Sequence, residues 1–263
     1  MAHISLLCIC NGVSFHVISC PPTWIILHII TFPPNSWPNC CVTLDVVNMP
    51  QTATVISCHR PDITSAIYTH VANTSHTTAE SRQHLSARLE DLLMKSWILV
   101  GILPVLSAIS VLASAEEALN IPKPDMGAQG SASHYAQLDL SQDIEERGYS
   151  YMKVLYRHNL DPIMSTWGSH QYDFEWLEKR VIYGLFLADH SILNTIETEL
   201  VVVSAIMAQG VRAPSLWHVR GLRRLGVGFH AVERVCEAIR ACGEWCGKDT
   251  KDWVRAHEVE VEV

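Results

Sequence analysis

One acid and one histidine stand in an otherwise apolar part of the chain, "TELVVVSAIMAQGVRAPSLWHVRG", residues 198–221. Glu199 begins the apolar run and His218 lies in the segment that follows, with Arg212 as the only charged residue between them. A carboxylate bound to an imidazole holds one tautomer of the ring and favours proton transfer near neutral pH. We therefore take Glu199 and His218 as candidate catalytic residues.

Arg212 and Arg220 are the candidate substrate-binding residues, because a guanidinium group can bind a substrate carboxylate through two hydrogen bonds. A structural interpretation is also open. Glu199 would then only match the helix dipole in a first turn, and His218 would be a packing histidine. Arg220, with Arg223 and Arg224, would form a solvated face or an oligomer contact.

The elements that must position these residues are predicted to be helices. Apolar periodicity and turn residues place three helices at 192–209, 214–225 and 230–245, with Pro214 at the first position of the second one. His218 then lies one turn into that helix. Short loops imply antiparallel neighbours, and no run of alternating strands precedes them, so we expect an all-α bundle.

Two further helices are expected upstream of this group. The segment "LSQDIEERGYSYMKVLYRH" has Ser141 as its predicted N-cap, and "DFEWLEKRVIYGLFLADH" has Asp173 in that role. The second helix should bury one face, made of Phe174, Leu177, Val181, Leu185 and Leu187 or Ala188.

The spacing around the acid and the histidine has the frame E-x11-C-x2-C-x3-H with both cysteine positions replaced, by Val211 and Pro214. This frame resembles the carboxymuconolactone decarboxylase/AhpD-like family. The segment "RGLRRLGVGFHAVERV" is similar to the family's histidine-bearing helix, glycine turn and next helix, and "WLEKRVIYGLFLADHSILNTIETELVVVSA" is similar to fungal members. The resemblance covers roughly residues 82–260. It implies an AhpD-like helical bundle, a homo-oligomer, and a cofactor-free lyase acting on a small carboxylate or lactone.

The missing thiol pair removes the chemistry of the AhpD branch. Val211 and Pro214 have no atoms for peroxide or disulfide reactions, so a thiol-dependent peroxidase is the least favoured function. Cys236, Cys242 and Cys246 are interpreted as small apolar residues of the last helix, where the dipole disfavours a thiolate. A catalytically silent helical scaffold that forms oligomers is the alternative to the enzyme.

Composition limits the partners. The chain has 263 residues and a formal net charge of −8, which argues against nucleic acid as the main partner, since that requires a basic face. The first residues lack the basic start of a secretory signal, so we expect a cytoplasmic protein with reduced thiols.

Residues 1–80 differ in composition from the rest. They hold one basic residue, three acids, seven of the twelve prolines and six of the nine cysteines. In "PPTWIILHIITFPPNSWPNCC" the apolar runs are too short to span a membrane and the prolines too frequent for helices, and the Cys and His spacing does not form the paired knuckles of a zinc site. We expect a disordered His-, Cys- and Pro-rich extension here, no bound metal, and a helical domain over residues 82–260.

Residues 96–115 contain no charge over the length of a transmembrane helix. From Met94 onward the sequence also imitates a signal peptide. Four serines, Gly101 and Pro104 make the segment only moderately apolar, and an amphipathic helix runs directly into it. We expect two helices of a soluble protein that meet at Pro104, and membrane insertion is the less favoured alternative.

Overall fold

The computed structural model describes residues 9–10, 13–14, 44–76, 78–121, 135 and 143–263. Over these residues the fold is all-α, as predicted, apart from one short strand pair, β1 (Ile9–Cys10) antiparallel to β2 (Val13–Ser14). The helices are α2 (Leu44–Ser57), α3 (Thr64–Thr74), α4 (Ala79–Val100), α5 (Ile102–Ala118), α6 (Ile144–Tyr156), α7 (Leu160–Ser165), α8 (Gln171–Trp176), the π-helix η6 (Leu177–Leu187), α9 (Thr195–Met207), α10 (Arg212–Arg224) and α11 (Phe229–Trp245). Short 3-10 turns are η2 (Pro61–Ile63), η4 (Arg157–Asn159), η5 (Gly168–His170), η7 (Ala256–Glu258) and η8 (Glu260–Glu262).

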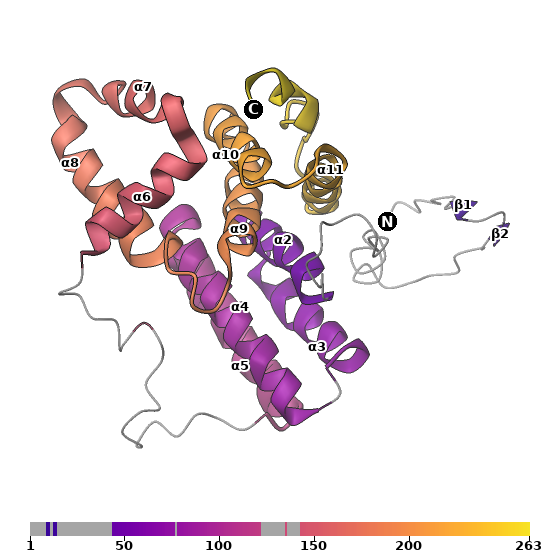
Figure 1. Ribbon diagram of the computed structural model, residues 1–263. Coiled ribbons are helices and arrows are strands. Elements are labelled where there is room, and N and C mark those ends of the chain that lie inside the picture. Colours follow the sequence, from indigo (N-terminus) through magenta and orange to yellow (C-terminus); the bar gives the residue numbers. More distant parts are fainter. Residues whose placement is uncertain (1–8, 11–12, 15–43, 77, 122–134, 136–142) are drawn as a thin grey trace.

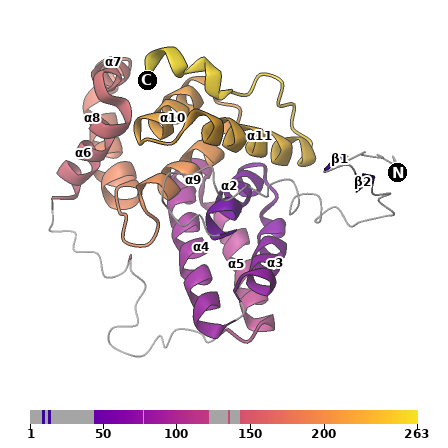
Figure 2. The same ribbon diagram turned by 45° about the vertical axis from the view of Figure 1, so that its right-hand side comes forward.

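The helices form two groups that meet at α9. Helices α2, α3, α4 and α5 lie side by side as a bundle, and α10 and α11 lie across one end of it (Figures 1 and 2). Helices α6, α7 and α8 form a separate outer arm beside α10. Helix α9 contacts α2 and α4 on the bundle side and α10 on the other side, while α6 packs on η6 and α10. Residues of α9 therefore face both groups.

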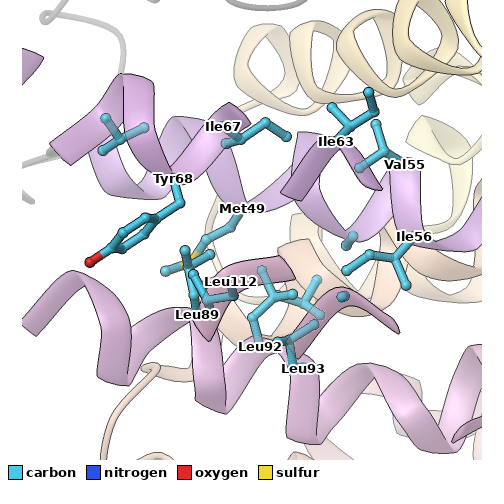
Figure 3. Close-up of a cluster of buried hydrophobic side chains, with 14 of the residues drawn as sticks. Met49, Val55, Ile56, Ile63, Ile67, Tyr68, Leu89, Leu92, Leu93 and Leu112 are labelled. Atoms are coloured by element: carbon cyan, nitrogen blue, oxygen red, sulfur yellow. The ribbon is translucent and has the colours of Figure 1, made fainter. Parts of the chain in front are cut away.

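Helix α2 lies in the core of the bundle, which corrects the prediction of a disordered extension for this part of residues 1–80. Met49 and Ile56 of α2 pack with Leu89 and Leu92 of α4 and with Leu112 of α5 (Figure 3). All five are at most 3% exposed. The remaining predicted extension, residues 1–43, lies outside the described residues except for the two short strands.

Burial explains why α2 forms despite an interior proline. Pro50 removes a helical hydrogen bond and costs about 3 kcal/mol. Each fully buried side chain such as Met49 or Ile56 contributes about 1.5–3 kcal/mol, so several of them offset that cost. The hydroxyls of Thr52, Thr54 and Ser57 are satisfied by carbonyls one turn earlier in the same helix, which lets a polar-looking sequence be buried.

The apolar segment 96–115 is divided between α4 and α5. The break falls at Gly101, whose φ of +86° suits glycine, and not at Pro104, which occupies the first turn of α5. Among the described residues, no helix is both long enough and apolar enough to span a membrane.

The π-helix changes which residues of the 173–190 segment are buried. Phe174 is 47% exposed and Asp173 lies inside α8 instead of capping it, while Tyr183, Gly184, Phe186 and Leu187 face the core. A π-helix closes its hydrogen bonds at i+5, so the buried face drifts from the one that a 3.6-residue period predicts. Of the predicted face, Leu187 and Ala188 are buried and Leu177, Val181 and Leu185 are partly buried, whereas the prediction was wrong at Phe174, which lies in α8 before the π-helix.

Candidate active site

Glu199 lies in the second turn of α9, not in the first turn as predicted. Asn194 is the N-cap and Glu197 is the first-turn acid, and the two form a reciprocal capping box. Glu197 also binds Arg88 of α4, with a nitrogen–oxygen distance of 2.7 Å. Glu199, two residues later, points to α10 and has no exposed surface. Its side chain therefore serves a different purpose from dipole matching.

His218 faces Glu199 from α10. The Nδ1 atom of His218 lies 2.8 Å from Oε1 of Glu199, so the structure brings the two predicted catalytic residues together. Helix α10 begins two residues earlier than expected, which puts Pro214 at its third position and not its first. Gly221, one turn after His218, makes room for the acid: a β-carbon there would lie 2.7 Å from Oε1 of Glu199.

Two tyrosines extend this pair into a hydrogen-bonded chain. The hydroxyl of Tyr156, at the end of α6, lies 3.1 Å from Nε2 of His218 and 2.6 Å from the hydroxyl of Tyr183 on η6. Both tyrosines are buried. We call the series Glu199–His218–Tyr156–Tyr183 the buried relay. Sequence reasoning missed its tyrosines, because they lie 43 and 16 residues before Glu199 and belong to two other elements.

The relay has a consistent direction of hydrogen bonding. An ionised Glu199 accepts the Nδ1 proton of His218, which leaves Nε2 to accept from the Tyr156 hydroxyl. The oxygen of Tyr156 then accepts from Tyr183. In this arrangement the three other members carry one proton each and Glu199 carries none; protonation of Nε2 would reverse the direction of the two hydrogen bonds that join His218, Tyr156 and Tyr183.

Close backbone packing fixes the two tyrosines. A β-carbon on Gly148 of α6 would lie 2.1 Å from the Lys179 carbonyl oxygen, and one on Gly184 would lie 2.3 Å from the Ile144 carbonyl oxygen. Only glycine permits this approach of α6 to η6. Arg147 donates to the Gly184 carbonyl at 2.6 Å and joins the same two elements.

Arg224 holds the end of α6 against α10. Its guanidinium donates to the carbonyls of Leu155 and Tyr156, at 2.8 and 2.5 Å, and to Oδ1 of Asn159 at 2.6 Å. It is 8% exposed, so it is neither a solvated residue nor an anion clamp. By capping α6, Arg224 sets the position of the Tyr156 hydroxyl.

Burial governs the electrostatics of the relay. Desolvation raises the pKa of Glu199, and the contacts with His218 and Tyr151 act against that rise. Desolvation also raises the pKa values of Tyr151, Tyr156 and Tyr183 well above the usual range, so these hydroxyls stay protonated. The relay thus lies in an apolar environment, and its two tyrosines are uncharged.

Glu178 is a further acid next to the relay that the sequence did not reveal. It lies on η6, is half-buried, and has a pKa raised by desolvation to about 7, with the nearby His218 acting in the opposite direction. A carboxyl group with such a pKa exchanges its proton near neutral pH, as general acids and bases do. The only signal in the sequence was an acid within an apolar helix.

The two predicted substrate-binding arginines lie in different environments. Arg212 is exposed and binds the C-terminal segment, through Glu258 and the carbonyl of Asp252. Arg220 is only 7% exposed and lies in α10, two residues after His218. Arg212 therefore braces the C-terminal segment. Arg220 is buried, but two residues along an α-helix correspond to a rotation of roughly 200°, so it does not share a helix face with His218.

A cavity of about 600 Å³ lies away from the relay, between the turn after α2 and the break between α4 and α5. Its lining is mainly apolar and consists of His59, Pro61, Val100, Gly101, Ile102, Leu103, Pro104 and Ser107. Within the described part of the chain, no three His, Cys, Asp or Glu residues are grouped so as to hold a metal ion.

No protein-family model, curated protein or solved structure matches the chain. The family resemblance therefore stays a prediction that depends on the Glu199–His218 frame.

Proposed function

We propose that the protein is a cofactor-free enzyme that moves a proton through His218 during decarboxylation, or a related lyase reaction, of a small carboxylate or lactone. The buried relay is the observation that carries this proposal, because it joins a carboxylate, an imidazole and two phenols into one chain of proton-exchanging groups. The reaction type and the substrate class rest on the resemblance of the Glu199–His218 frame to the decarboxylase branch.

The chemistry assigns one task to each residue. Loss of CO2 leaves an electron pair on carbon, and an acid must supply a proton to that carbon. His218 in its imidazolium form would supply this proton: its Nε2 protonates Tyr156, the Tyr156 proton passes to Tyr183, and the Tyr183 hydroxyl protonates the carbon, which leaves both phenols neutral and His218 as the neutral imidazole. Glu199 keeps Nδ1 protonated and stabilises the imidazolium while it exists. Glu178 would return the proton from solvent, since its pKa is about 7.

The outer arm supports the proposal of a homo-oligomer. Tyr172, Phe174 and Trp176 of α8 are 86%, 47% and 51% exposed, and adjacent exposed aromatic side chains are typical of protein interfaces. Replacing all three residues by serine should reduce the mass of the particle in sedimentation analysis. An unchanged mass would contradict this interface.

The enzyme proposal is tested with His218→Asn and Glu199→Gln. A panel of small lactone acids and β-keto acids is incubated with the full chain, and CO2 release is measured. We expect His218→Asn to abolish turnover and Glu199→Gln to reduce it by roughly a hundredfold. The matched control is His230→Asn, an exposed histidine on α11, which should retain full activity. Turnover that persists in folded His218→Asn protein would contradict the proposal.

A catalytically silent oligomeric scaffold is the second candidate. The burial of His218 favours this candidate, because only 4% of the residue is accessible and both ring nitrogens already have partners. Under this candidate, His218→Asn lowers the unfolding temperature, and neither the wild type nor the variant converts any member of the panel. Turnover by the wild type would exclude it.

A further inference from the structure

Two cysteines that are far apart in the sequence lie at the ends of two helices that pack against each other. Cys58 follows α2 and Cys246 follows α11, and these two helices pack against each other. Cys58 belongs to a buried apolar cluster against which Cys246 packs, and Arg60, two residues after Cys58, lies 5.1 Å from the ring centre of Trp245, the residue before Cys246. Both are free thiols; Cys58 is buried and Cys246 is half-buried.

The local structure around the two cysteines is the same. After Cys58, the amides of His59 and Arg60 bond to the carbonyls of Ile56 and Val55, at 3.0 and 2.8 Å. This is a Schellman cap, with His59 in the left-handed region at φ +62°. Cys58 therefore lies at a capped helix C-terminus and not in a loop.

After Cys246, the amides of Gly247 and Lys248 bond to the carbonyls of Glu244 and Gly243, both at 2.9 Å, and Gly247 has φ +82°. The sequences Cys-His-Arg and Cys-Gly-Lys thus place a cation at the same position of each cap. Arg60 also lies 5.1 Å from the ring centre of Trp245 and binds Asp62 at 2.8 Å, which holds the guanidinium beside Cys246.

The charges around the pair distinguish the two thiols. The contact with Cys58 is the main cause that lowers the pKa of Cys246, and Arg60 and Lys248 add to it, while burial and Asp62 oppose it. The same contact and desolvation raise the pKa of Cys58. Desolvation raises the pKa values of Cys236 and Cys242 to about 12, which agrees with the prediction that they are inert packing residues. Cys246 differs from these two residues because it is only half-buried and has Arg60 and Lys248 nearby.

We propose that Cys246 and Cys58 form an oxidisable thiol site, in which Cys246 reacts first with a hydroperoxide and Cys58 then closes a disulfide between α11 and α2. This site is independent of the proposed lyase reaction, and its residues do not occupy the Val211 and Pro214 positions of the frame.

The oxidation balances in two steps. The Cys246 thiolate attacks the peroxide, so a sulfur–oxygen bond forms, the oxygen–oxygen bond breaks, and hydroxide leaves to be protonated. The sulfur of Cys58 then attacks the sulfenic acid of Cys246. A sulfur–sulfur bond forms, and the hydroxyl group departs with the Cys58 proton as water. Two thiols lose two electrons, and hydrogen peroxide becomes two molecules of water. A small dithiol reverses the change by exchange.

The test uses the full chain in its reduced form, treated with equimolar hydrogen peroxide and digested without reduction. Mass spectrometry should find the Cys58 and Cys246 peptides linked. In Cys58→Ser, dimedone should label Cys246 as a trapped sulfenic acid, and in Cys246→Ser the Cys58 thiol should stay unmodified. The matched control, Cys236→Ser, should form the same link as the wild type. Cys246 that remains a thiol, or that pairs with another cysteine, would overturn the proposal.

A second measurement needs no variant. A disulfide between Cys58 and Cys246 would close a loop of 187 intervening residues and restrict the unfolded chain. The oxidised protein should therefore melt roughly 10 °C above the reduced protein. Equal melting temperatures in a sample whose thiols are fully oxidised would contradict a link between α2 and α11.

Discussion

Two buried polar clusters lie on opposite sides of α9, and they are built from different chemistry. On the bundle side, Lys95 binds Asp91 at 2.6 Å and the Asp189 carbonyl at 2.7 Å, and Asp91 also accepts from Leu193 and Tyr135. On the arm side, the buried relay contains one carboxylate and no lysine or arginine among its four members. We call the first group the Asp91 cluster.

The difference concerns the kind of polar contact in each cluster. In the Asp91 cluster, the Lys95 ammonium forms an ion pair with Asp91; burial lowers the pKa of Lys95, and Asp91 opposes that change. Such an ion pair fixes the relative positions of helices. In the relay, by contrast, phenol and imidazole groups are joined by hydrogen bonds. Both clusters are buried, so they differ in the type of buried group and not in burial.

Asp91→Asn should cause the largest loss of stability. The Lys95 ammonium, which has no exposed surface, would keep a buried charge without its carboxylate. We expect the free energy of unfolding in urea to fall by about 3–5 kcal/mol. The control is Lys251→Gln, which removes an exposed ion pair with Asp249 and should leave the urea midpoint unchanged. A loss below about 1 kcal/mol would contradict the interpretation that the Asp91 cluster fixes the positions of the helices.

Gly148→Ala should separate the two tyrosines of the relay. The new methyl group would meet the Lys179 carbonyl at 2.1 Å, and a backbone atom cannot rotate away. We expect a loss of about 3 kcal/mol in unfolding free energy, together with a loss of the Tyr156–Tyr183 contact. Gly228→Ser is the control, since a β-carbon there has open space and serine is a favoured N-cap. If Gly148→Ala leaves stability and any activity intact, the packing of α6 on η6 is looser than described.

Tyr156→Phe should have a smaller effect on stability. It keeps the ring but removes the hydroxyl that joins His218 to Tyr183, at a cost of about 1–3 kcal/mol. Nitrogen NMR of His218 should show the Nδ1-protonated tautomer in the wild type and a shifted Nε2 signal in the variant. Tyr172→Phe, at an exposed site, should change neither measurement. An Nε2 signal unaffected by Tyr156→Phe would contradict the relay.

Glu178→Gln should change stability only through its dependence on pH. Folding raises the pKa of Glu178 from an ordinary 4.5 to about 7, so the folded state binds more protons between these values. The wild type should therefore lose stability relative to Glu178→Gln as the pH rises from about 4.5 to about 7, by on the order of 2 kcal/mol. Glu145→Gln, at an exposed acid of α6, should follow the wild type. A difference that grows in the opposite direction would contradict the raised pKa.

The sequence by itself determined the all-α class, the helices near residues 192–245 and the pairing of Glu199 with His218. Helical periodicity is a local property, and an acid and a histidine on consecutive antiparallel helices meet at nearby levels. The same local reasoning failed for α2, because the value of burying Met49 and Ile56 depends on neighbours more than 30 residues away. It was also incomplete on η6, where a π-helical turn shifts the buried face.

Only the tertiary structure decided which groups complete each site. Tyr183 reaches Tyr156, which bonds to His218, because Gly148 and Gly184 let two backbones approach closely. A single sequence shows the glycines but not what they face. Cys58 and Cys246 are separated by 187 residues, and their contact follows from the packing of α2 on α11. Local spacing specifies helices and the residues within a turn of each other, while the protonation and reactivity of a side chain depend on the groups that packing brings to it.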